Sequence, residues 1–458
     1  MTRTVEADVV IAGAGTTGAY LAWRLAEAGF RCVVLEAHPL ETLGKSIGPF
    51  HVEEIAFERF GLPLPEGDEL FHVESRQAMW APGQERSFNF EFPVYVMDKP
   101  LFIRRLHRYA REARAEMIDR TGVEGVIMER GFPGGLRARG EAGDVEVRGR
   151  LVIDASGVDG AARTRMPDSR WFENEPLEDR DTIFVYMETW RDIKGELPPG
   201  VNGHPYFQGW CAPGPEDTRI VGTGMTGSYE AAKKRHGRFA GRLPFEGTVE
   251  TSAGGRIPYR RPPFSLVDNG LMVAGDAAFM NKPFSGEGVT SAFAACLAAI
   301  EVASEALEAD DLSREALWRY NTLYFRDQGA KFAFMTAMLP AVMGVSEAEM
   351  DLFFTVPGLL TESGALAMNE DYEIENDPAA VVKALPYIAG GLLRGELRAS
   401  TLASLARAGA AAGRLKKQYG RYPDHPMGFA SWLEKVVPLW KHAEEVKYRY
   451  FDSVAGSL

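Results

Sequence analysis

The chain has 458 residues, with 51 Lys and Arg against 64 Asp and Glu, and a net charge of −13. Hydrophobic residues make up 45% and charged residues 25%, which is ordinary for a globular protein and excludes collagen-like, disordered and disulfide-scaffold classes. An acidic chain lacks the clustered positive charge that nucleic acids select, so we expect no nucleic-acid partner. At about 150 residues per domain, this length predicts about three domains.

Cysteine and histidine spacing excludes two further classes. The three cysteines lie far apart and the eight histidines show no metal-ligand spacing, so we predict no disulfide framework and no metal site. This cysteine usage, without a signal-peptide pattern, favours the cytoplasm. The most apolar stretch, residues 332–345, contains Pro340 and is shorter than the about 18–20 residues of a membrane span. Peripheral membrane association therefore stays open.

The N-terminus predicts a strand, a helix and a second strand. Residues 8–12 and 31–35 are uninterrupted apolar runs, typical of strands buried on both faces. Residues 19–28 between them predict a helix, and Gly29 suits the position after its end.

The turn before this helix carries Gly13, Gly15 and Gly18, and Glu36 follows the second strand. The first glycine allows a tight turn, the second lets the backbone approach a pyrophosphate, and the third permits close helix–strand packing. Free N–H groups at the helix start bind anions, and the carboxylate of Glu36 accepts hydrogen bonds from a ribose. The pattern predicts a dinucleotide site.

A second feature selects the dinucleotide. Residues 271–274 predict another buried strand, followed by Gly275-Asp276 and then by a glycine-containing segment, 283–289, that opens a helix near Gly286. A strand-end acid followed by such a helix suits a ligand that extends away from the first site, as FAD does. Asp276 would face its ribityl or phosphate region. The amides of the later segment would stabilise negative charge on the flavin ring.

The remaining elements suggest two further regions. Residues 101–117 predict an amphipathic helix, and residues 145–154 predict a strand. Short alternating runs between 171 and 265 predict an antiparallel sheet in a second domain. From 332 onward the periodicity is mostly helical.

These motifs resemble the flavoprotein group that includes aromatic hydroxylases and, within it, the geranylgeranyl reductase family, which saturates double bonds in prenyl chains. The resemblance is carried by residues 8–18 with Glu36, 152–157 with Arg163, 254–258 and 275–288. It implies an α/β fold (α+β overall): a Rossmann-like FAD-binding domain of GR2 type, an inserted antiparallel-sheet substrate domain and a helical C-terminal region.

The order of the motifs predicts a discontinuous first domain. We assign residues 1–75, 96–170 and 265–330 to the FAD-binding domain. Residues 76–95 and 171–264 form the predicted substrate domain, and residues 331–458 form the helical region.

The residue-by-residue resemblance also implies the cofactor contacts. Together with the glycine motifs they are Gly13, Gly15, Thr17, Gly18, Glu36, Ile47, Gly48, Lys99, Val123, Asp276, Gly286, Gly288 and Val289. Lys99 stands where the family has Arg, which keeps the charge but loses the planar fork. Family members often carry a Cys in the loop that corresponds to residues 44–48, and this chain has none. The sequence predicts no catalytic residue.

Tyr206, Gln208 and Trp210 partly match the family's substrate-strand pattern. Two-residue spacing would place their side chains on one face of a strand, toward the flavin. Ordinary sheet packing is the alternative for all three.

We therefore predict an FAD-dependent oxidoreductase that reduces C=C bonds of a prenyl or other apolar or lipid substrate by hydride transfer from reduced flavin. The electron donor, NAD(P)H or ferredoxin, and the oligomeric state stay open. One alternative is a flavin-dependent monooxygenase or halogenase-like enzyme acting on a small aromatic or natural-product substrate. Another is a non-redox flavin-dependent cyclase.

Overall fold

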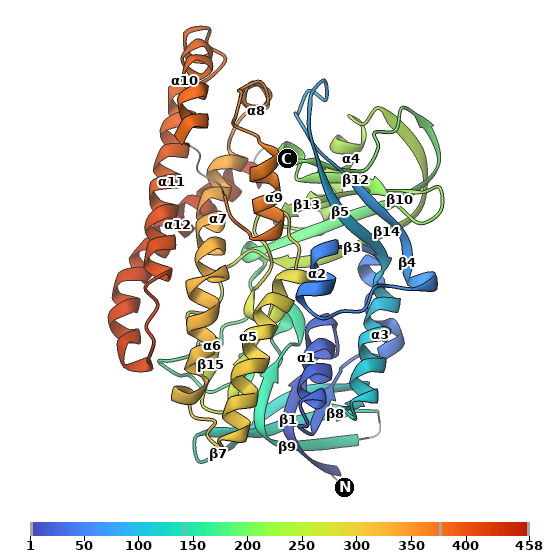
Figure 1. The fold of residues 1–458 in the computed structure, drawn as a ribbon, viewed down its shortest axis with the longest axis vertical. Coiled ribbons are helices and arrows are strands. Elements are labelled where there is room, and N and C mark those ends of the chain that lie inside the picture. Colours follow the sequence, from blue (N-terminus) through green and yellow to red (C-terminus); the bar gives the residue numbers. More distant parts are fainter. Residues whose placement is uncertain (1–2, 142, 375–377, 456–458) are drawn as a thin grey trace.

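The computed structural model describes residues 3–141, 143–374 and 378–455. These residues form two sheets, with one face of the first covered by helices and a layer of long helices from the C-terminal part alongside (Figure 1). The fold is α/β with a Rossmann-like N-terminal unit and a helical C-terminal region, as the sequence predicts. Residues 375–377 and 456–458 of the predicted helical region lie outside the described residues.

The first sheet has the strand order β15-β16-β9-β1-β2-β6, with β8 beside β9 and β7 beside β8. Its central strands pair in parallel, and all four residues of β2 are buried, because a parallel sheet is covered on both faces. Its strands are β1 (Arg3–Ala12), β2 (Cys32–Leu35), β6 (Glu116–Ile118), β7 (Thr121–Glu129), β8 (Phe132–Gly140), β9 (Gly143–Asp154), β15 (Val267–Asp268) and β16 (Leu271–Val273).

Three helices lie together against this sheet: α1 (Thr16–Glu27), α3 (Lys99–Glu112) and α5 (Val289–Glu308). Helix α1 packs between α3 and α5. Helix α3 is shorter than the predicted 101–117, because Arg114 adopts a φ of 72° and turns the chain into β6. Helix α5 begins three residues after Gly286, whose φ is 75°.

The second sheet has the order β14-β10-β13-β12-β11-β4-β5-β3. Neighbouring strands in this sheet pair antiparallel, except for β11 and β4, which pair in parallel. Its strands are β3 (Pro49–Glu53), β4 (Leu70–Trp80), β5 (Ser87–Asp98), β10 (Thr182–Gly195), β11 (Val201–His204), β12 (Gly209–Pro213), β13 (Arg219–Thr226) and β14 (Phe245–Pro258). Strand β3 joins this sheet from a range that the sequence assigned to the first domain. The domain boundaries themselves stay a prediction.

Helix α4 (Tyr229–Ala240) covers one face of the second sheet, where Ala232 packs with Phe184 and Met225. The other face, which we call the inner face, carries Gly255 and Ile257 of β14. Ile257 reaches the loop before α5, because a Cβ on Gly286 would lie 3.0 Å from its Cδ1. The inner face therefore adjoins the start of α5.

The described part of the C-terminal region consists of helices joined by turns and loops, without a strand. Its long helices α7, α11 and α12 pack along one another beside α6 (Figure 1). The helices are α6 (Arg314–Arg326), α7 (Gln328–Met343), α8 (Glu347–Phe353), α9 (Glu362–Glu370), α10 (Pro378–Leu393), α11 (Ala399–Tyr419) and α12 (Phe429–Ala455); the short α2 (Glu54–Arg59) lies in the N-terminal part.

One helix of the described chain, α5, is long and apolar enough to cross a membrane, but its most apolar window is 56% buried inside the fold. Helices α7 and α8 pass the same test only as a pair, which is bent by 120°. The contacts of α5 with α1 and α6 indicate a core helix of the fold.

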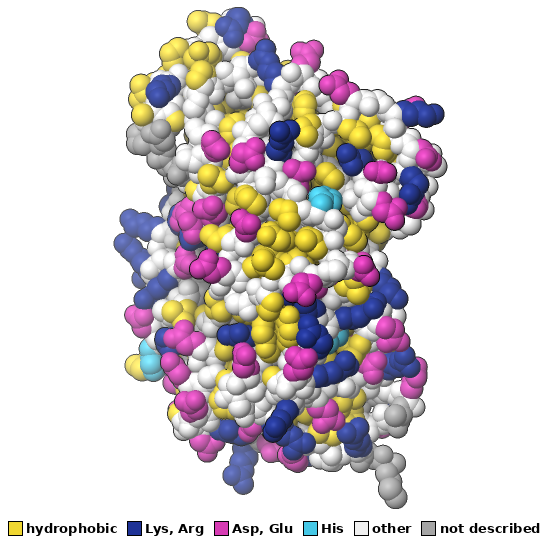
Figure 2. All heavy atoms as spheres, turned by 45° about the vertical axis from the view of Figure 1, so that its right-hand side comes forward, with side chains coloured by type: hydrophobic (Ala, Val, Ile, Leu, Met, Phe, Trp, Pro, Cys, Tyr) yellow, Lys and Arg dark blue, Asp and Glu magenta, His cyan; other side chains and the backbone are white. Residues whose placement is uncertain are grey.

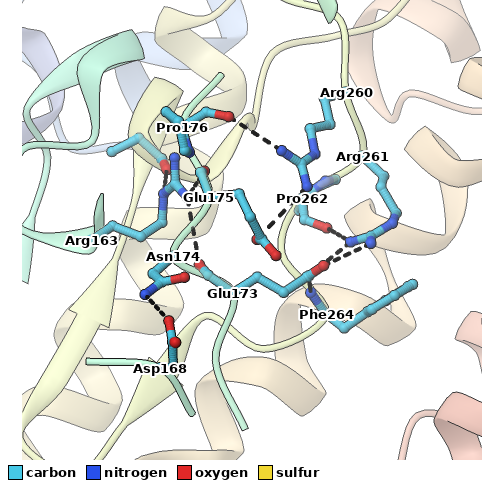
Figure 3. A network of polar contacts seen from close by, with 11 residues as sticks. Arg163, Asp168, Glu173, Asn174, Glu175, Pro176, Arg260, Arg261, Pro262 and Phe264 are labelled. Atoms are coloured by element: carbon cyan, nitrogen blue, oxygen red, sulfur yellow. Dashed lines mark hydrogen bonds and ion pairs between the residues drawn. The ribbon is translucent and has the colours of Figure 1, made fainter. Parts of the chain in front are cut away.

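A buried ion pair fixes the strand-to-strand connection between the two sheets (Figure 3). Residues 259–266 leave β14 in the second sheet and enter β15 in the first. In this connection Arg261 donates to both carboxylate oxygens of Glu173, at 2.7 and 2.8 Å, and the same carboxylate accepts from the backbone N of Phe264. The Arg261 side chain is 10% exposed. The ion pair therefore holds the segment around Glu173 against the connection between the two sheets.

Candidate functional site

The three glycines in the turn between β1 and α1 differ in the space around them. A Cβ on Gly13 would lie 2.5 Å from the backbone O of Ala155, and a Cβ on Gly18 would lie 1.9 Å from the O of Gly13. A Cβ on Gly15 would meet no atom within 4 Å. Gly15 is also the N-cap of α1 and supplies no side-chain cap. The first and third glycines are thus required by the protein's own packing, whereas the second faces open space at a helix N-terminus, which fits a pyrophosphate.

Glu36 follows β2 and is buried. Its carboxylate accepts from the backbone N of Ala14 at 2.8 Å and from the backbone N of His38 at 2.9 Å. The acid therefore also holds the glycine turn in place, a contact that sequence reasoning missed. Its own backbone O accepts from Thr121 N at 2.7 Å, which brings the start of β7, and with it Val123, to the same edge of the sheet.

The central motif is organised by the carboxylate of Asp154, at the end of β9. This carboxylate accepts from the backbone N of Ser156 and Ala162. The side chain of Arg163 is also fixed by a hydrogen bond (Figure 3). Its Nε donates to the backbone O of Ala277 at 2.8 Å. Arg163 thus connects the central motif to the Gly275–Ala278 turn. Sequence spacing predicted both motifs but not this bond between them.

Two half-buried groups of opposite charge, Lys99 and Asp276, lie close together in the site. Burial lowers the pKa of Lys99 and raises the pKa of Asp276, and in each case the opposite charge of the other residue counteracts the shift. Gly275 brings this turn against α1, since a Cβ on it would lie 2.5 Å from Thr17 Oγ1. A cationic and an anionic group at adjoining points fit a ligand that presents phosphate and hydroxyl groups.

The predicted flavin loop lies at the same place. Gly48 accepts a hydrogen bond from the backbone N of Lys99 at 2.9 Å. A Cβ on Gly288, the N-cap of α5, would lie 3.3 Å from Asp276 Oδ1, and Val289 begins the helix. Ile47 is described by its backbone alone. The structure therefore brings the two predicted backbone segments, residues 47–48 and 286–289, together with Lys99 and Asp276.

The expectation that Tyr206, Gln208 and Trp210 share one strand is wrong. Pro205 opens a 3-10 turn that contains Tyr206, and Gln208 adopts a φ of 50°. Only Trp210 lies on a strand, β12. The signal for this turn was Pro205, whose fixed φ and missing N–H disfavour a strand interior.

Trp210 lies on the inner face of the second sheet. It stands opposite Gly222, and a Cβ on that glycine would lie 2.3 Å from the indole. Across β10, Gly222 lies level with Ala253 of β14. Gly255 is two residues further along β14 and therefore projects from the same face. Tyr206 instead offers its backbone O to Arg235 of α4 at 2.6 Å. A role of these three residues in substrate binding stays a prediction.

A charged network beside the flavin loop was missed by sequence reasoning. His51 Nε2 and Glu287 Oε1 are 2.9 Å apart, and Lys282 Nζ donates to the other oxygen of Glu287 at 2.6 Å. Glu53 accepts from Thr290 Oγ1. Lys282 and Glu287 fall within the predicted motif of residues 275–288, whereas His51 and Glu53 come from β3, a strand that carries no motif.

The described residues contain no group of three or more His, Cys, Asp or Glu side chains that could hold a metal ion. Cys32, Cys211 and Cys296 are buried and free.

Comparison with known proteins places this geometry in a family. A family model described as "NAD(P)-binding Rossmann-like domain" matches residues 11–57. The digeranylgeranylglycerophospholipid reductase of Sulfolobus acidocaldarius is 25% identical over 456 residues, which cover 95% of this chain and 97% of that protein. The protein of the same name from Methanosphaerula palustris is 30% identical over 341 residues, 69% of this chain and 81% of that protein.

Solved structures share the fold. A geranylgeranyl bacteriochlorophyll reductase-like protein from Thermoplasma acidophilum has a TM-score of 0.71 at 20% identity, covering 84% of this chain and all of that one. The flavin-dependent brominase Bmp2 has a TM-score of 0.64 at 16% identity, covering 85% of this chain and all of the brominase. At these identities the likeness shows the fold alone.

The two-sheet fold and the glycine-lined, charged site define a flavin-dependent oxidoreductase. The sequence relatives narrow this class. The chain belongs to the geranylgeranyl reductase family of flavoproteins, as the motifs of its N-terminal 289 residues predict.

Proposed function

We propose that this protein binds FAD and reduces C=C bonds in prenyl chains of lipids. The observation that carries the proposal is the match to digeranylgeranylglycerophospholipid reductases, one of which extends over 95% of this chain, helical region included. The chemistry that a bound flavin supplies to such a substrate is hydride transfer.

The chain's own residues have defined tasks in this proposal. Gly15 and the first amides of α1 bind the pyrophosphate, and Glu36 accepts from the adenosine ribose. Lys99 and Asp276 bind the middle of the cofactor. The backbone at Gly48 and at Gly286–Val289 holds the flavin ring, where the N-terminus of α5 stabilises negative charge.

The substrate would lie against the inner face of the second sheet. Gly222 makes room for the Trp210 indole, which lies over it, and Trp210 and Ile257 keep this face apolar. Across from it, Phe332 and Met335 of α7 form an apolar cluster with Tyr372, against which Phe284 packs from the loop before α5. An apolar boundary on both sides would exclude water and admit a hydrocarbon chain.

We also propose peripheral contact with a lipid surface through α10. Val382, Leu385 and Leu393 are 65%, 55% and 89% exposed, and their spacing places them along one stripe of the helix. In Figure 1, α10 forms the upper end of the molecule, and in Figure 2 apolar side chains gather at that end with Lys and Arg among them. Residues 382–420 contain seven Lys or Arg and one Glu, although the whole chain is acidic. This local charge complements an anionic membrane.

The direct test follows the bound flavin through one turnover. The purified protein is reduced anaerobically with dithionite and mixed with a geranylgeranyl phospholipid, and the flavin absorbance is followed. We expect reoxidation of the flavin together with a lipid that has gained two hydrogens for each bond reduced. Replacing dithionite with NAD(P)H or with reduced ferredoxin then identifies the donor. Reoxidation only by oxygen together with an aromatic compound would replace this function with a monooxygenase.

A further inference from the structure

His51 stands at the centre of a network that the proposed binding of flavin and substrate does not use. His51 and Glu53 lie two residues apart on β3, so both side chains project from the same face of the strand. That face meets the loop before α5. There His51 Nε2 contacts Glu287 Oε1 at 2.9 Å, and Glu53 accepts from Thr290 Oγ1 in the first turn of the helix.

The network lies against both backbone segments proposed to hold the flavin ring. His51 follows Gly48 by three residues along the chain, and Glu287 stands between Gly286 and Gly288. The hydrogen bond between His51 and Glu287 therefore joins the two segments directly. A group at this position is next to the place where we expect the reaction.

Burial changes steeply across the network. Lys282 is 2% exposed and Glu53 is 5% exposed, whereas 34% of the His51 side chain is accessible. His51 Nδ1 has no hydrogen-bond partner among the residues that the structure describes. The imidazole is thus anchored at Nε2 to Glu287, its Nδ1 is left without a partner among these residues, and about a third of the side chain is accessible.

The surrounding charges favour the protonated form of the imidazole. Burial opposes a charge on His51, but the hydrogen bond and the negative charge of Glu287, with a contribution from Glu53, raise its pKa above the ordinary value. Lys282 acts in the opposite direction. Burial would raise the pKa of Glu287, yet Lys282 and His51 hold it well below its usual range.

The C-terminal helices close the network. Lys282 Nζ donates to Asn369 Oδ1 of α9 at 3.1 Å and lies 5.8 Å from the ring centre of Tyr372. Ser285 donates to the same carboxylate oxygen of Glu287 that Lys282 binds. Glu287 is therefore held by three side chains and cannot turn away from His51 without breaking all three contacts.

We propose that His51 supplies the proton that C=C reduction requires, and that Glu287 and Lys282 are positioning residues for it. This inference rests on the proposed function, because it assigns the proton donor of the same reaction. Sequence reasoning found no such donor.

The proposed step balances in protons and electrons. His51 gives its Nδ1 proton to one alkene carbon, and the electron pair of the C=C bond forms the new C–H bond there. The other carbon receives the hydride, so the alkene is reduced and the flavin is oxidised. His51 becomes a neutral imidazole and takes up a proton from water through its accessible edge.

The experiment compares His51→Gln with wild type, and uses His72→Gln as a matched control. His72 lies on β4 in the same sheet, is only partly buried, and makes no bond to a carboxylate. Each protein is loaded with flavin, reduced with dithionite and mixed anaerobically with a geranylgeranyl phospholipid at several pH values. Flavin affinity is measured in parallel.

For wild type and His72→Gln we expect the reoxidation rate to fall as pH rises through the raised pKa of His51, since only the protonated form donates. For His51→Gln we expect flavin affinity within about threefold of wild type, a rate at least about 100-fold lower, and no such fall with pH. Equal rates and equal pH profiles in His51→Gln and wild type would overturn the assignment. Failure of wild type with every prenyl lipid would instead overturn the proposed function, and the inference with it.

A second variant keeps the assignment testable if His51→Gln does not bind flavin. In Glu287→Gln the negative partner is lost, so the His51 pKa, followed by NMR of the imidazole in the protein without substrate, should move down. The descending limb of the rate profile should move down by the same amount. A moved His51 pKa with an unmoved rate profile would show that Glu287 has only a structural role and that His51 is not the donor.

Discussion

The flavin site and the C-terminal helices show opposite uses of small and apolar residues. Around the site, glycines such as Gly13 and Gly18 stand where any Cβ would strike backbone, and the apolar strands beside them are fully buried. In α10, residues such as Val382 and Leu393 are exposed, on a helix that other elements leave uncovered along one stripe. In our proposal the backbone of the first region holds the cofactor, and the exposed stripe of the second contacts a lipid surface.

The largest effects should come from substitutions in the glycine turn. They would distinguish the glycine that the fold requires from the glycine that the cofactor requires. Gly18→Ala places a Cβ 1.9 Å from a backbone oxygen, so we expect loss of folded protein. Gly15→Ala meets no atom of the chain within 4 Å, and the φ of −65° at this position suits any residue.

We therefore expect Gly15→Ala to fold with an unchanged melting temperature but to bind FAD at least about tenfold more weakly, because the new methyl group occupies the path of the pyrophosphate. Circular dichroism and flavin titration measure the two properties. Unchanged FAD affinity in Gly15→Ala would contradict the pyrophosphate assignment.

The next effect concerns the connection between the sheets. Glu173→Gln leaves Arg261 buried without its carboxylate, and breaking such a pair costs about 3 kcal/mol in the free energy of unfolding. Urea unfolding of the flavin-free protein measures this cost. Glu178→Gln, in an exposed pair with Arg180, is the control and should change stability little.

The same pair predicts how stability depends on pH. Burial would raise the pKa of Glu173, but Arg261 and the Phe264 amide lower it below the ordinary value. The folded state therefore binds fewer protons than the unfolded state, so this stabilisation is present above the unfolded pKa, about 4.3, and is lost as pH falls through the lowered folded pKa. Glu173→Gln should lack this contribution, and an equal loss of stability on acidification in both proteins would contradict it.

A smaller effect should show that membrane binding by α10 is independent of cofactor binding. Leu393→Asp removes an exposed apolar side chain from α10, and one leucine contributes about 1.5–3 kcal/mol on full burial. We expect at least tenfold weaker binding to vesicles of anionic phospholipid, with FAD affinity unchanged. Met427→Asp is the matched control, since Met427 is 86% exposed and Leu393 is 89% exposed. Equal loss in both variants would show that α10 is not the contact.

The smallest effect concerns the charge on the same helix. Lys383→Gln should weaken vesicle binding about fivefold, since a basic residue near an anionic surface contributes about 1 kcal/mol. The difference should disappear at high salt, where exposed charges are screened. Lys435→Gln, exposed on α12, serves as the control. A salt-independent effect would argue against an electrostatic contribution.

Much of the flavin site could be predicted, because its requirements are local. A tight turn next to a buried strand needs glycine at fixed positions, so the spacing of Gly13, Gly15 and Gly18 predicts the turn. The strand-end position of Asp276 follows from the apolar run before it. The substrate candidates could not be predicted in the same way, since Pro205 converts the expected strand into a turn and only Trp210 reaches the inner face.

The class of fold, the acidic composition and the glycine motifs of a flavoprotein can be read from the amino-acid sequence, because they depend on residue type and short spacing. Which distant groups meet depends on the packing of the whole chain. It joined His51 to Glu287 across 236 positions and Arg261 to Glu173 across 88. It also left one stripe of the apolar helix α10 exposed while burying most of α5, which is apolar as well. The physical reason is that a charge pair or an exposed face depends on which elements pack together, and no local pattern encodes that packing.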